Sequence, residues 1–181
     1  MKQMNTPNKL TLLRVIMIPF FVVFMLADLG SWSKWAALIV FVVASMTDWL
    51  DGYLARRDHL VTDFGKFMDP LADKLLVCSA MICLVEMGRL SAWIVIIIIG
   101  REFIISGFRL IASDNGIVIA ASYWGKIKTV CQMIMIILLI ADLGSSFAVA
   151  EQILIYLSLA LTVISLADYL YKNRQVLSMQ D

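Results

Sequence analysis

The sequence predicts an all-α integral membrane protein with six transmembrane helices, on the evidence of its composition, its length and its pattern of apolar stretches. Of the 181 residues, 61% are hydrophobic and 16% are charged, and the mean hydropathy is +0.88. Soluble domains carry about 25% charged residues, so lipid is expected to be the main solvent of this chain. Each bilayer crossing needs about 20 mainly apolar residues, so the length allows about six crossings. We expect them to form a single domain over residues 1–181.

Six apolar stretches are separated by polar or turn-forming segments, and each is expected to form one helix. They cover residues 10–29, 34–54, 69–87, 92–112, 123–141 and 150–170. The first stretch is long enough to cross a bilayer and has no small-residue cleavage site. We therefore expect it to remain as a helix and not to be removed as a signal peptide.

Lysine and arginine are distributed unevenly between the two sides of the expected membrane domain. All of them except Lys34 and Arg89 fall on one side, or in the adjoining half of the membrane, together with both termini. Because cytoplasmic loops carry an excess of Lys and Arg, we expect that side to be the cytoplasm of a bacterial cell. The net charge of +1 argues against a nucleic-acid partner, which would require a clustered basic surface.

Four aspartates lie where lipid-facing helices avoid charge, at the end of the second apolar stretch and the start of the third. An intramembrane carboxylate costs roughly 2.5–3.5 kcal/mol, so such residues normally face a cavity, a partner or an ion. The three-residue spacing of Asp48 and Asp51 puts them on one helical face, and so does the four-residue spacing of Asp69 and Asp73. Two antiparallel helices could then oppose the two pairs.

Four carboxylates in one small site would repel one another unless cations were bound between them. Oxygen ligands suit Mg²⁺ or Mn²⁺, whereas Zn²⁺ more often recruits His or Cys, and His59 is the only histidine. Two such ions would stabilise the attacking and leaving oxygens of a phosphoryl displacement. We therefore predict a site for two divalent metal ions.

A face of small residues adjoins the first aspartate pair. Gly52 and Ala55 continue that face at helical spacing, and their size would let a phosphate approach the backbone. Arg56 adds a fixed cation beside it. A purely structural alternative is that the aspartates form ion pairs at the membrane edge with Arg56, Arg57, Lys66 and Lys74. Pro70 could mark the first turn of a helix capped by Asp69, or it could kink a longer helix.

These residues resemble the signature of the CDP-alcohol phosphatidyltransferase family, D-x2-D-G-x2-A-R-x8-G-x3-D-x3-D. Every spacing is met, by Asp48, Asp51, Gly52, Ala55, Arg56, Gly65, Asp69 and Asp73. The resemblance implies a cytoplasmic site in which Asp48, Asp51 and Asp69 bind metal ions. Asp73 would both contact metal and take the proton of the acceptor alcohol. The resemblance also implies CDP-diacylglycerol as the donor and a homodimer that associates through membrane helices.

Other residues would contact the CDP-lipid if the resemblance holds. Those implied by the signature region are Gly52, Ala55, Arg56 and Thr62. The segment PNKLTLLR looks like the entry segment of the family, which makes Asn8 and Thr11 candidates for nucleotide contacts. Alternatively, these two residues only cap the first helix, since Asn and Thr are ordinary N-cap residues.

Two later segments bear on the acceptor. GREFIISGFR places Arg101 and Arg109 on roughly one helical face, where a guanidinium facing lipid would be costly. YWGKIKT places Lys126 and Lys128 at the start of the fifth helix. Together they could bind an acceptor that carries its own phosphate, such as glycerol 3-phosphate. Both segments, with Glu102, also resemble the subgroup of the family that makes phosphatidylglycerophosphate and releases CMP.

Simpler explanations remain open for the basic residues and for the chain as a whole. Lys126 and Lys128 could anchor a helix end, and Arg101 could pair with Glu102, although adjacent helical residues point about 100° apart. The acceptor could instead be phosphatidylglycerol, serine or an inositol phosphate. A divalent-cation transporter and a catalytically silent scaffold are further alternatives. The small-residue face beside Arg56 speaks against a transporter, and the complete signature speaks against a silent scaffold.

Overall fold

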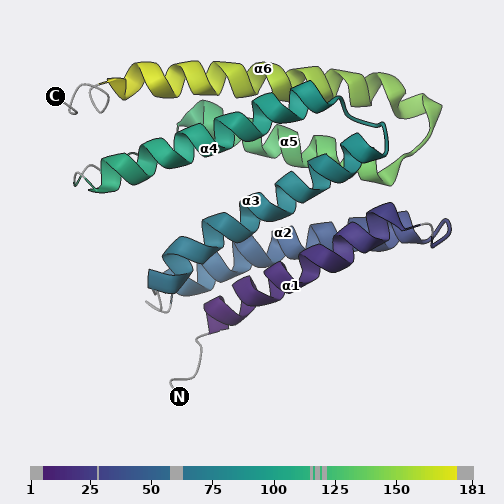
Figure 1. Cartoon of the computed structure of the whole chain (residues 1–181), viewed down its shortest axis with the longest axis horizontal. Coiled ribbons are helices and arrows are strands. Elements are labelled where there is room, and N and C mark those ends of the chain that lie inside the picture. The colour runs from purple at the N-terminus through teal and green to yellow at the C-terminus, as the bar shows by residue number, and fades with distance from the viewer. Residues whose placement is uncertain are drawn as a thin grey trace. The chain divides into compact units, whose positions relative to one another are not determined.

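The computed structural model describes residues 6–27, 29–57, 63–114, 116, 119 and 122–174, and that part of the chain is helical without strands. Its elements are α1 (Thr6–Leu26), α2 (Ser33–Arg57), α3 (Asp63–Glu86), α4 (Ala92–Asp114), α5 (Tyr123–Ala141), the 3-10 turn η1 (Ser145–Phe147) and α6 (Ala148–Lys172). The expectation of an all-α chain with six helices is confirmed. The chain divides into two compact units, Met1–Arg89 with α1 to α3 and Leu90–Asp181 with α4 to α6 (Figure 1).

The helix bounds follow the apolar stretches, with a clear difference in α3. α5 begins and ends as expected, because the Ser122 side chain accepts a hydrogen bond from the Gly125 N–H and Asp142 ends the helix in the left-handed conformation. α3 begins at Asp63 and not at residue 69, so Pro70 lies inside a longer helix. The first-turn alternative for Pro70 is therefore wrong. The missing N–H of this proline removes one hydrogen bond from a helix of 24 residues.

The first unit packs α1 against both α2 and α3. α1 has one buried stripe, whose members recur every three or four residues and are Thr11, Arg14, Ile18, Phe21 and Met25. The Phe21 ring lies 5.8 Å from the ring of Phe41 on α2, between centroids. The apolar part of the stripe forms the core, and its polar part lies toward the start of α1.

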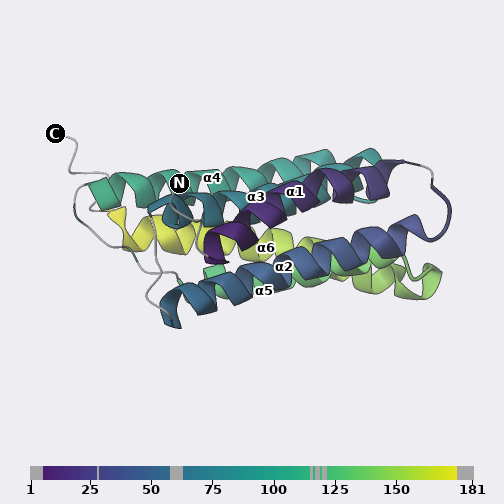
Figure 2. The ribbon, with the colours of Figure 1, turned by 90° about the horizontal axis from the view of Figure 1, so that it is seen from below.

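The second unit is organised around α6, which runs beside both α4 and α5 (Figure 2). The inner face of α6 is partly polar, since Ser158, Thr162 and Ser165 are completely buried beside Ile155, Leu161 and Tyr169. The hydroxyls of Thr162 and Ser165 donate to carbonyls one turn earlier, over 2.6 Å and 3.0 Å. The small side chain of Ser165 leaves room for the long side chain of Arg101 on α4, whose Nε donates to the Ser165 hydroxyl over 3.1 Å.

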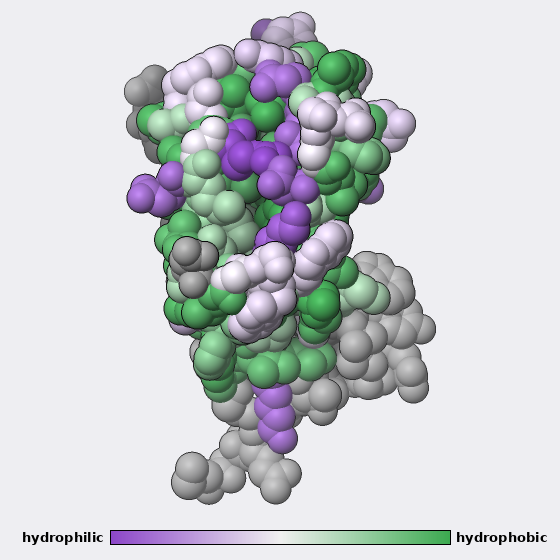
Figure 3. All heavy atoms as spheres, turned by 90° about the vertical axis from the view of Figure 1, so that its right-hand side faces the viewer, coloured by the Kyte–Doolittle hydropathy of each residue, from purple (hydrophilic) through white to green (hydrophobic). Residues whose placement is uncertain are grey.

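Large hydrophobic side chains lie on the outside of the helices. Ile39, Ile96, Leu110 and Val149 are between 62% and 71% exposed. Figure 3 shows hydrophobic residues over much of the face that it draws. Within the residues that the structure describes, three spans are long and apolar enough to cross a membrane, namely Lys9–Leu26, Tyr123–Ala141 and Ser145–Lys172. Apolar faces turned outward on long helices are typical of a multi-pass membrane protein.

Candidate active site

The four aspartates of the signature lie near the junction of α2 and α3. Asp48 and Asp51 lie in the second half of α2, and Asp69 and Asp73 lie in the first half of α3. Only residues 58–62 connect the two helices, and α2 contacts α3, so all four backbone positions are toward the same end of the first unit. The helical conformation confirms that each pair shares a face. The side chains of the first pair lie outside the described residues, so the meeting of the two pairs stays a prediction.

The remaining signature residues of this region are placed by their backbones. Gly52, Ala55 and Arg56 lie in the last two turns of α2. Thr62 and His59 lie outside the described residues, and so does the side chain of Arg56. Nucleotide contacts of this group therefore stay predictions, as do the alternative ion pairs with the aspartates.

Thr11 connects the first helix to the second aspartate pair. Its hydroxyl donates a hydrogen bond to Oδ1 of Asp69 over 2.5 Å, and the residue is only 1% exposed. Because α1 begins at Thr6, Thr11 and Asn8 lie inside the helix, and the alternative that they cap it is wrong. The side chain of Asn8 lies outside the part of the chain that the structure describes. The bond to Thr11 fixes the orientation of the Asp69 carboxylate.

The carboxylate oxygens at this end of the first unit are suitable ligands for hard divalent cations. Asp69 and Asp73 are both partly buried on α3, and a carboxylate that accepts one hydrogen bond keeps further lone pairs for a cation. Among the described side chains, no three His, Cys, Asp or Glu residues come together, so a complete site would need Asp48 and Asp51 as well. A set of carboxylate oxygens suits Mg²⁺ or Mn²⁺ better than Zn²⁺.

Arg14 is a buried residue to which the sequence patterns assigned no site role. It is completely buried, and its Nε donates to the carbonyl oxygen of Ala44 on α2 over 3.2 Å. Ala44 precedes Asp48 by one helical turn, so Arg14 ties α1 to α2 beside the aspartate pair. The signal that could have found it is its register on α1, where it falls between Thr11 and Ile18 on the buried stripe.

Replacing Arg14 by methionine is expected to destabilise the first unit. A lost hydrogen bond from a charged donor costs about 1.5–3 kcal/mol, which corresponds to a fall in Tm of about 5–10 °C for a chain of this size. The measurement is thermal unfolding of the purified protein in detergent. Lys9→Met is the control, because Lys9 lies on the same helix and is exposed. Equal Tm values for the two variants would contradict a bracing role for Arg14.

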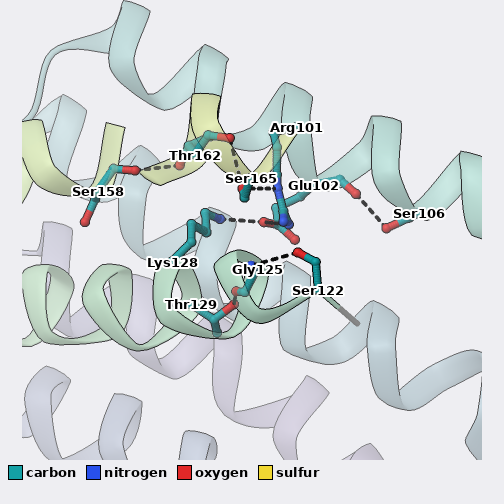
Figure 4. A network of polar contacts seen from close by, with 10 residues as sticks. All are labelled: Arg101, Glu102, Ser106, Ser122, Gly125, Lys128, Thr129, Ser158, Thr162 and Ser165. Carbon is teal, nitrogen blue, oxygen red and sulfur yellow. Dashed lines mark hydrogen bonds and ion pairs between the residues drawn. The ribbon is translucent and has the colours of Figure 1, made fainter. Parts of the chain in front are cut away.

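A buried cluster of charges joins the three helices of the second unit (Figure 4). Oε1 of Glu102 on α4 accepts hydrogen bonds from Nη1 of Arg101 over 3.0 Å and from Nζ of Lys128 on α5 over 2.5 Å. Nε of Arg101 donates to Oγ of Ser165 on α6 over 3.1 Å. Arg101 is 7% exposed and Lys128 is 1% exposed. In the described contacts two cations share one carboxylate, and such an excess of cations favours an anionic ligand.

The structure brings together two of the four basic residues that were expected to bind the acceptor. Arg101 and Lys128 meet at Glu102, and the burial of Lys128 argues against a surface anchor. The ion pair of adjacent residues forms despite their different directions, because the long Arg101 side chain reaches the same oxygen as Lys128. Arg109 is exposed, with Cζ 5.8 Å from the centroid of the Tyr169 ring. Lys126 is exposed on the first turn of α5.

Comparison with known proteins identifies the family. The family model described as CDP-alcohol phosphatidyltransferase matches residues 4–164. The CDP-diacylglycerol–glycerol-3-phosphate 3-phosphatidyltransferase of Bacillus subtilis (strain 168) is 44% identical, over 96% of this chain and 97% of that protein. Proteins of the same name from Haemophilus influenzae and Escherichia coli K12 are 42% and 40% identical, over 92% and 95% of this chain and 91% and 96% of their own lengths. With its signature aspartates on α2 and α3 inside the matched range, this chain belongs to the CDP-alcohol phosphatidyltransferase family.

Proposed function

We propose that the protein transfers the phosphatidyl group of CDP-diacylglycerol to glycerol 3-phosphate, giving phosphatidylglycerophosphate and CMP. The observation that carries the proposal is that relatives named for this reaction are 40–44% identical over nearly the whole chain. The aspartates near the junction of α2 and α3 support the transfer chemistry. The buried cations of α4 and α5 support an acceptor that carries a phosphate.

The residues proposed to bind the donor lie in the first unit. Asp48, Asp51, Asp69 and Asp73 would hold two Mg²⁺ or Mn²⁺ ions. When bound, such ions supply charge stabilisation at the pyrophosphate of the donor and at the departing CMP. Thr11 keeps the Asp69 carboxylate in one orientation through their hydrogen bond.

Residues around the aspartates would orient the CDP moiety. The small size of Gly52 and Ala55 would let the CDP moiety approach the backbone of α2, and Arg56 would supply a cation. Asn8, Thr11 and Thr62 are proposed as further nucleotide contacts. Thr11 is the member of this group whose described side chain already contacts a signature aspartate.

Asp73 is the proposed general base. Its carboxylate would take the proton of the 1-hydroxyl of glycerol 3-phosphate, whose oxygen then attacks the phosphorus that bears the diacylglycerol. The bond from that phosphorus to the bridging oxygen of the pyrophosphate breaks, and CMP leaves with the electron pair. The proposed ligands of the acceptor phosphate are Arg101, Arg109, Lys126 and Lys128, whose charged N–H groups form strong hydrogen bonds with phosphate oxygens. Holding the acceptor phosphate at fixed cations would restrict the orientation of the acceptor hydroxyl.

Lys128→Met is expected to raise the KM for glycerol 3-phosphate by about 10–100-fold, because a hydrogen bond from a charged group contributes about 1.5–3 kcal/mol. The KM for CDP-diacylglycerol should stay unchanged. The measurement is initial rate against each substrate. Lys172→Met is the control, because Lys172 lies on the surface and pairs with Asp168 one turn away. If the Lys128→Met variant has the wild-type KM for glycerol 3-phosphate, Lys128 does not bind the acceptor.

Acceptor competition tests the proposed function directly. Purified protein receives CDP-diacylglycerol and Mg²⁺ with equal concentrations of glycerol 3-phosphate, phosphatidylglycerol, serine and an inositol phosphate, and the lipid products are identified by mass spectrometry. Phosphatidylglycerophosphate is expected as the main product. If another phospholipid is the main product, the phosphatidyl transfer stands and the assigned acceptor is wrong. Metal flux into sealed vesicles without any CDP-lipid would instead support a transporter.

The proposed setting is the bacterial cell membrane, crossed by all six helices, with both termini and the active site on the cytoplasmic side and two copies in a homodimer. The distribution of charge supports the orientation within the first unit. Lys34 lies at the start of α2 and Arg89 follows the end of α3, whereas the aspartates lie toward the opposite ends of these helices. A reporter fused to the C-terminus that is active only in the cytoplasm tests the orientation, and the mass of the protein in detergent tests the dimer.

A further inference from the structure

Glu102 has an unusual place in the charge cluster of the second unit. Both of its ion pairs, to Arg101 and to Lys128, use the same oxygen, Oε1 (Figure 4). The two cations come from different helices, so this carboxylate oxygen joins α4 to α5 at a fixed point. The Glu102 side chain is 21% exposed, whereas those of its two partners are 8% and 1% exposed. The carboxylate therefore holds two side chains that are more deeply buried than itself.

The guanidinium of Arg101 is held on two of its three nitrogens. Nε donates to Ser165 and Nη1 donates to Glu102, and a planar group fixed at two points has a fixed direction for the third. Among the described residues, Nη2 makes no hydrogen bond. It lies at Gly125 on α5, where a Cβ atom would be only 3.1 Å from Nη2. An arginine that is 7% exposed thus directs unused donors at the first turn of α5.

The first turn of α5 adds to the positive field at this point. The start of a helix carries a partial positive charge from its backbone N–H groups. The Ser122 side chain accepts the N–H of Gly125, and Lys128 follows one turn later with its ammonium on Glu102. A Cβ at Gly125 would lie only 3.1 Å from Nη2 of Arg101 and 3.3 Å from Oγ of Ser122, so Nη2 can approach this helix closely because residue 125 has no side chain. An anion that reaches Nη2 of Arg101 would therefore meet a donor whose direction is fixed.

We propose that Glu102 is a positioning residue, which holds Arg101 and Lys128 so that Nη2 of Arg101 is directed over Gly125 at the phosphate of the acceptor alcohol. This inference rests on the proposed function, because it assumes an acceptor that carries a phosphate monoester. Gly125 contributes by having no side chain, because a Cβ there would press on Nη2 of Arg101. Glu102 does not touch the acceptor in this account, and it acts through the two cations.

A simpler role for Glu102 is to neutralise charge, and the two roles predict opposite results. If Glu102 only reduced the net charge, glutamine would leave the cluster more positive and strengthen the binding of a phosphate. Aspartate, which keeps the charge, would then behave as the wild type. If Glu102 positions the cations, both substitutions misplace them, because glutamine loses the charge-assisted hydrogen bonds and aspartate is too short to reach both partners.

The first test measures kcat and KM of Glu102→Gln and Glu102→Asp for each substrate. We expect kcat/KM for glycerol 3-phosphate to fall by about 10–100-fold in both, the range that results from a misplaced substrate. The KM for CDP-diacylglycerol should stay at the wild-type value. Wild-type or higher kcat/KM for glycerol 3-phosphate in either variant would overturn the positioning role.

The second test compares alanine substitutions at two glycines, and it remains informative if the Glu102 variants do not fold. In Gly125→Ala, the new Cβ presses on Nη2, and we expect the KM for glycerol 3-phosphate to rise by about three- to tenfold, as for a side chain pushed off its rotamer. Gly107→Ala on α4 is the control, because a Cβ there meets nothing within 4 Å. Alanine is the better helix former, which offsets the close contacts of the new Cβ with Nη2 and, at 3.3 Å, with Oγ of Ser122, so we expect neither variant to lose Tm. A normal KM in Gly125→Ala would overturn the proposal.

The outcomes for this inference and for the proposed function are distinguishable. If the wild type uses glycerol 3-phosphate and the variants do too with normal constants, only the inference fails. If the wild type uses another alcohol that bears a phosphate, the named acceptor fails and the same variants are measured with that alcohol. If its acceptor has no phosphate group, both fail.

Discussion

Asp73→Asn is expected to lower the rate of phosphatidyl transfer by about 10²–10⁴-fold, the usual contribution of a general base. Asparagine keeps the shape of the side chain but cannot take the proton of the acceptor hydroxyl. The other three aspartates remain, so binding of CDP-diacylglycerol at saturating Mg²⁺ should be largely preserved. The measurement pairs the rate of CMP release with direct binding of the CDP-lipid to the same preparation.

The matched control is Asp142→Asn. Asp142 is exposed after α5 and has a φ of 44°, a left-handed conformation that asparagine adopts readily. This variant should turn over like the wild type. Normal turnover in Asp73→Asn would exclude Asp73 as the base. If the variant loses CDP-lipid binding together with turnover, the loss of activity is explained by weaker binding of the donor and not by the loss of a base.

Removal of divalent cations is expected to abolish turnover, and added Mg²⁺ or Mn²⁺ should restore it. Without them, four carboxylates would face the pyrophosphate of the donor, and charge on the leaving CMP would lack stabilisation. The structure adds a sharper test through Thr11, which orients Asp69. Thr11→Val keeps the shape and loses the hydroxyl, and loss of such a supporting hydrogen bond costs about 10–100-fold in metal affinity. The midpoint of a Mg²⁺ titration of activity should rise by that factor.

Thr162→Val is the control for this titration. It also removes a buried hydroxyl, but Thr162 lies on α6 and donates only to the Ser158 carbonyl. Its Mg²⁺ midpoint should match the wild type. Activity that persists in excess chelator would contradict metal dependence altogether. If the Mg²⁺ midpoint of Thr11→Val equals that of the control, Thr11 does not support metal binding.

The helices could be predicted from the sequence because lipid-facing segments must be long and apolar. α5 matched at both ends, where Ser122 and Asp142 supply cap residues with clear local preferences. The predicted start of α3 is too late, because the prediction follows the apolar stretch and the first turn of α3 contains the polar residues Asp63 and Lys66. Pro70 has a φ compatible with a helix, and α3 continues on both sides of it although the proline loses one backbone hydrogen bond and crowds the carbonyl one turn earlier.

The contacts of the candidate site could be predicted only in part. The signature placed the four aspartates on two consecutive helices, since spacing determines which residues share a face. No spacing rule relates Thr11 to Asp69, which are 58 residues apart, or brings Arg14 to Ala44. The bridge from Glu102 to Lys128 likewise depends on how α4 and α5 pack. The direction of Arg109 onto Tyr169 depends on the packing of α4 and α6.

The most direct test of the central claim is CMP release from CDP-diacylglycerol by the purified protein with Mg²⁺, with and without glycerol 3-phosphate, and with the lipid product identified. We expect CMP release to require glycerol 3-phosphate and to yield phosphatidylglycerophosphate in equal amount. CMP release that no alcohol stimulates, or that leaves no new phospholipid, would contradict the proposed transfer.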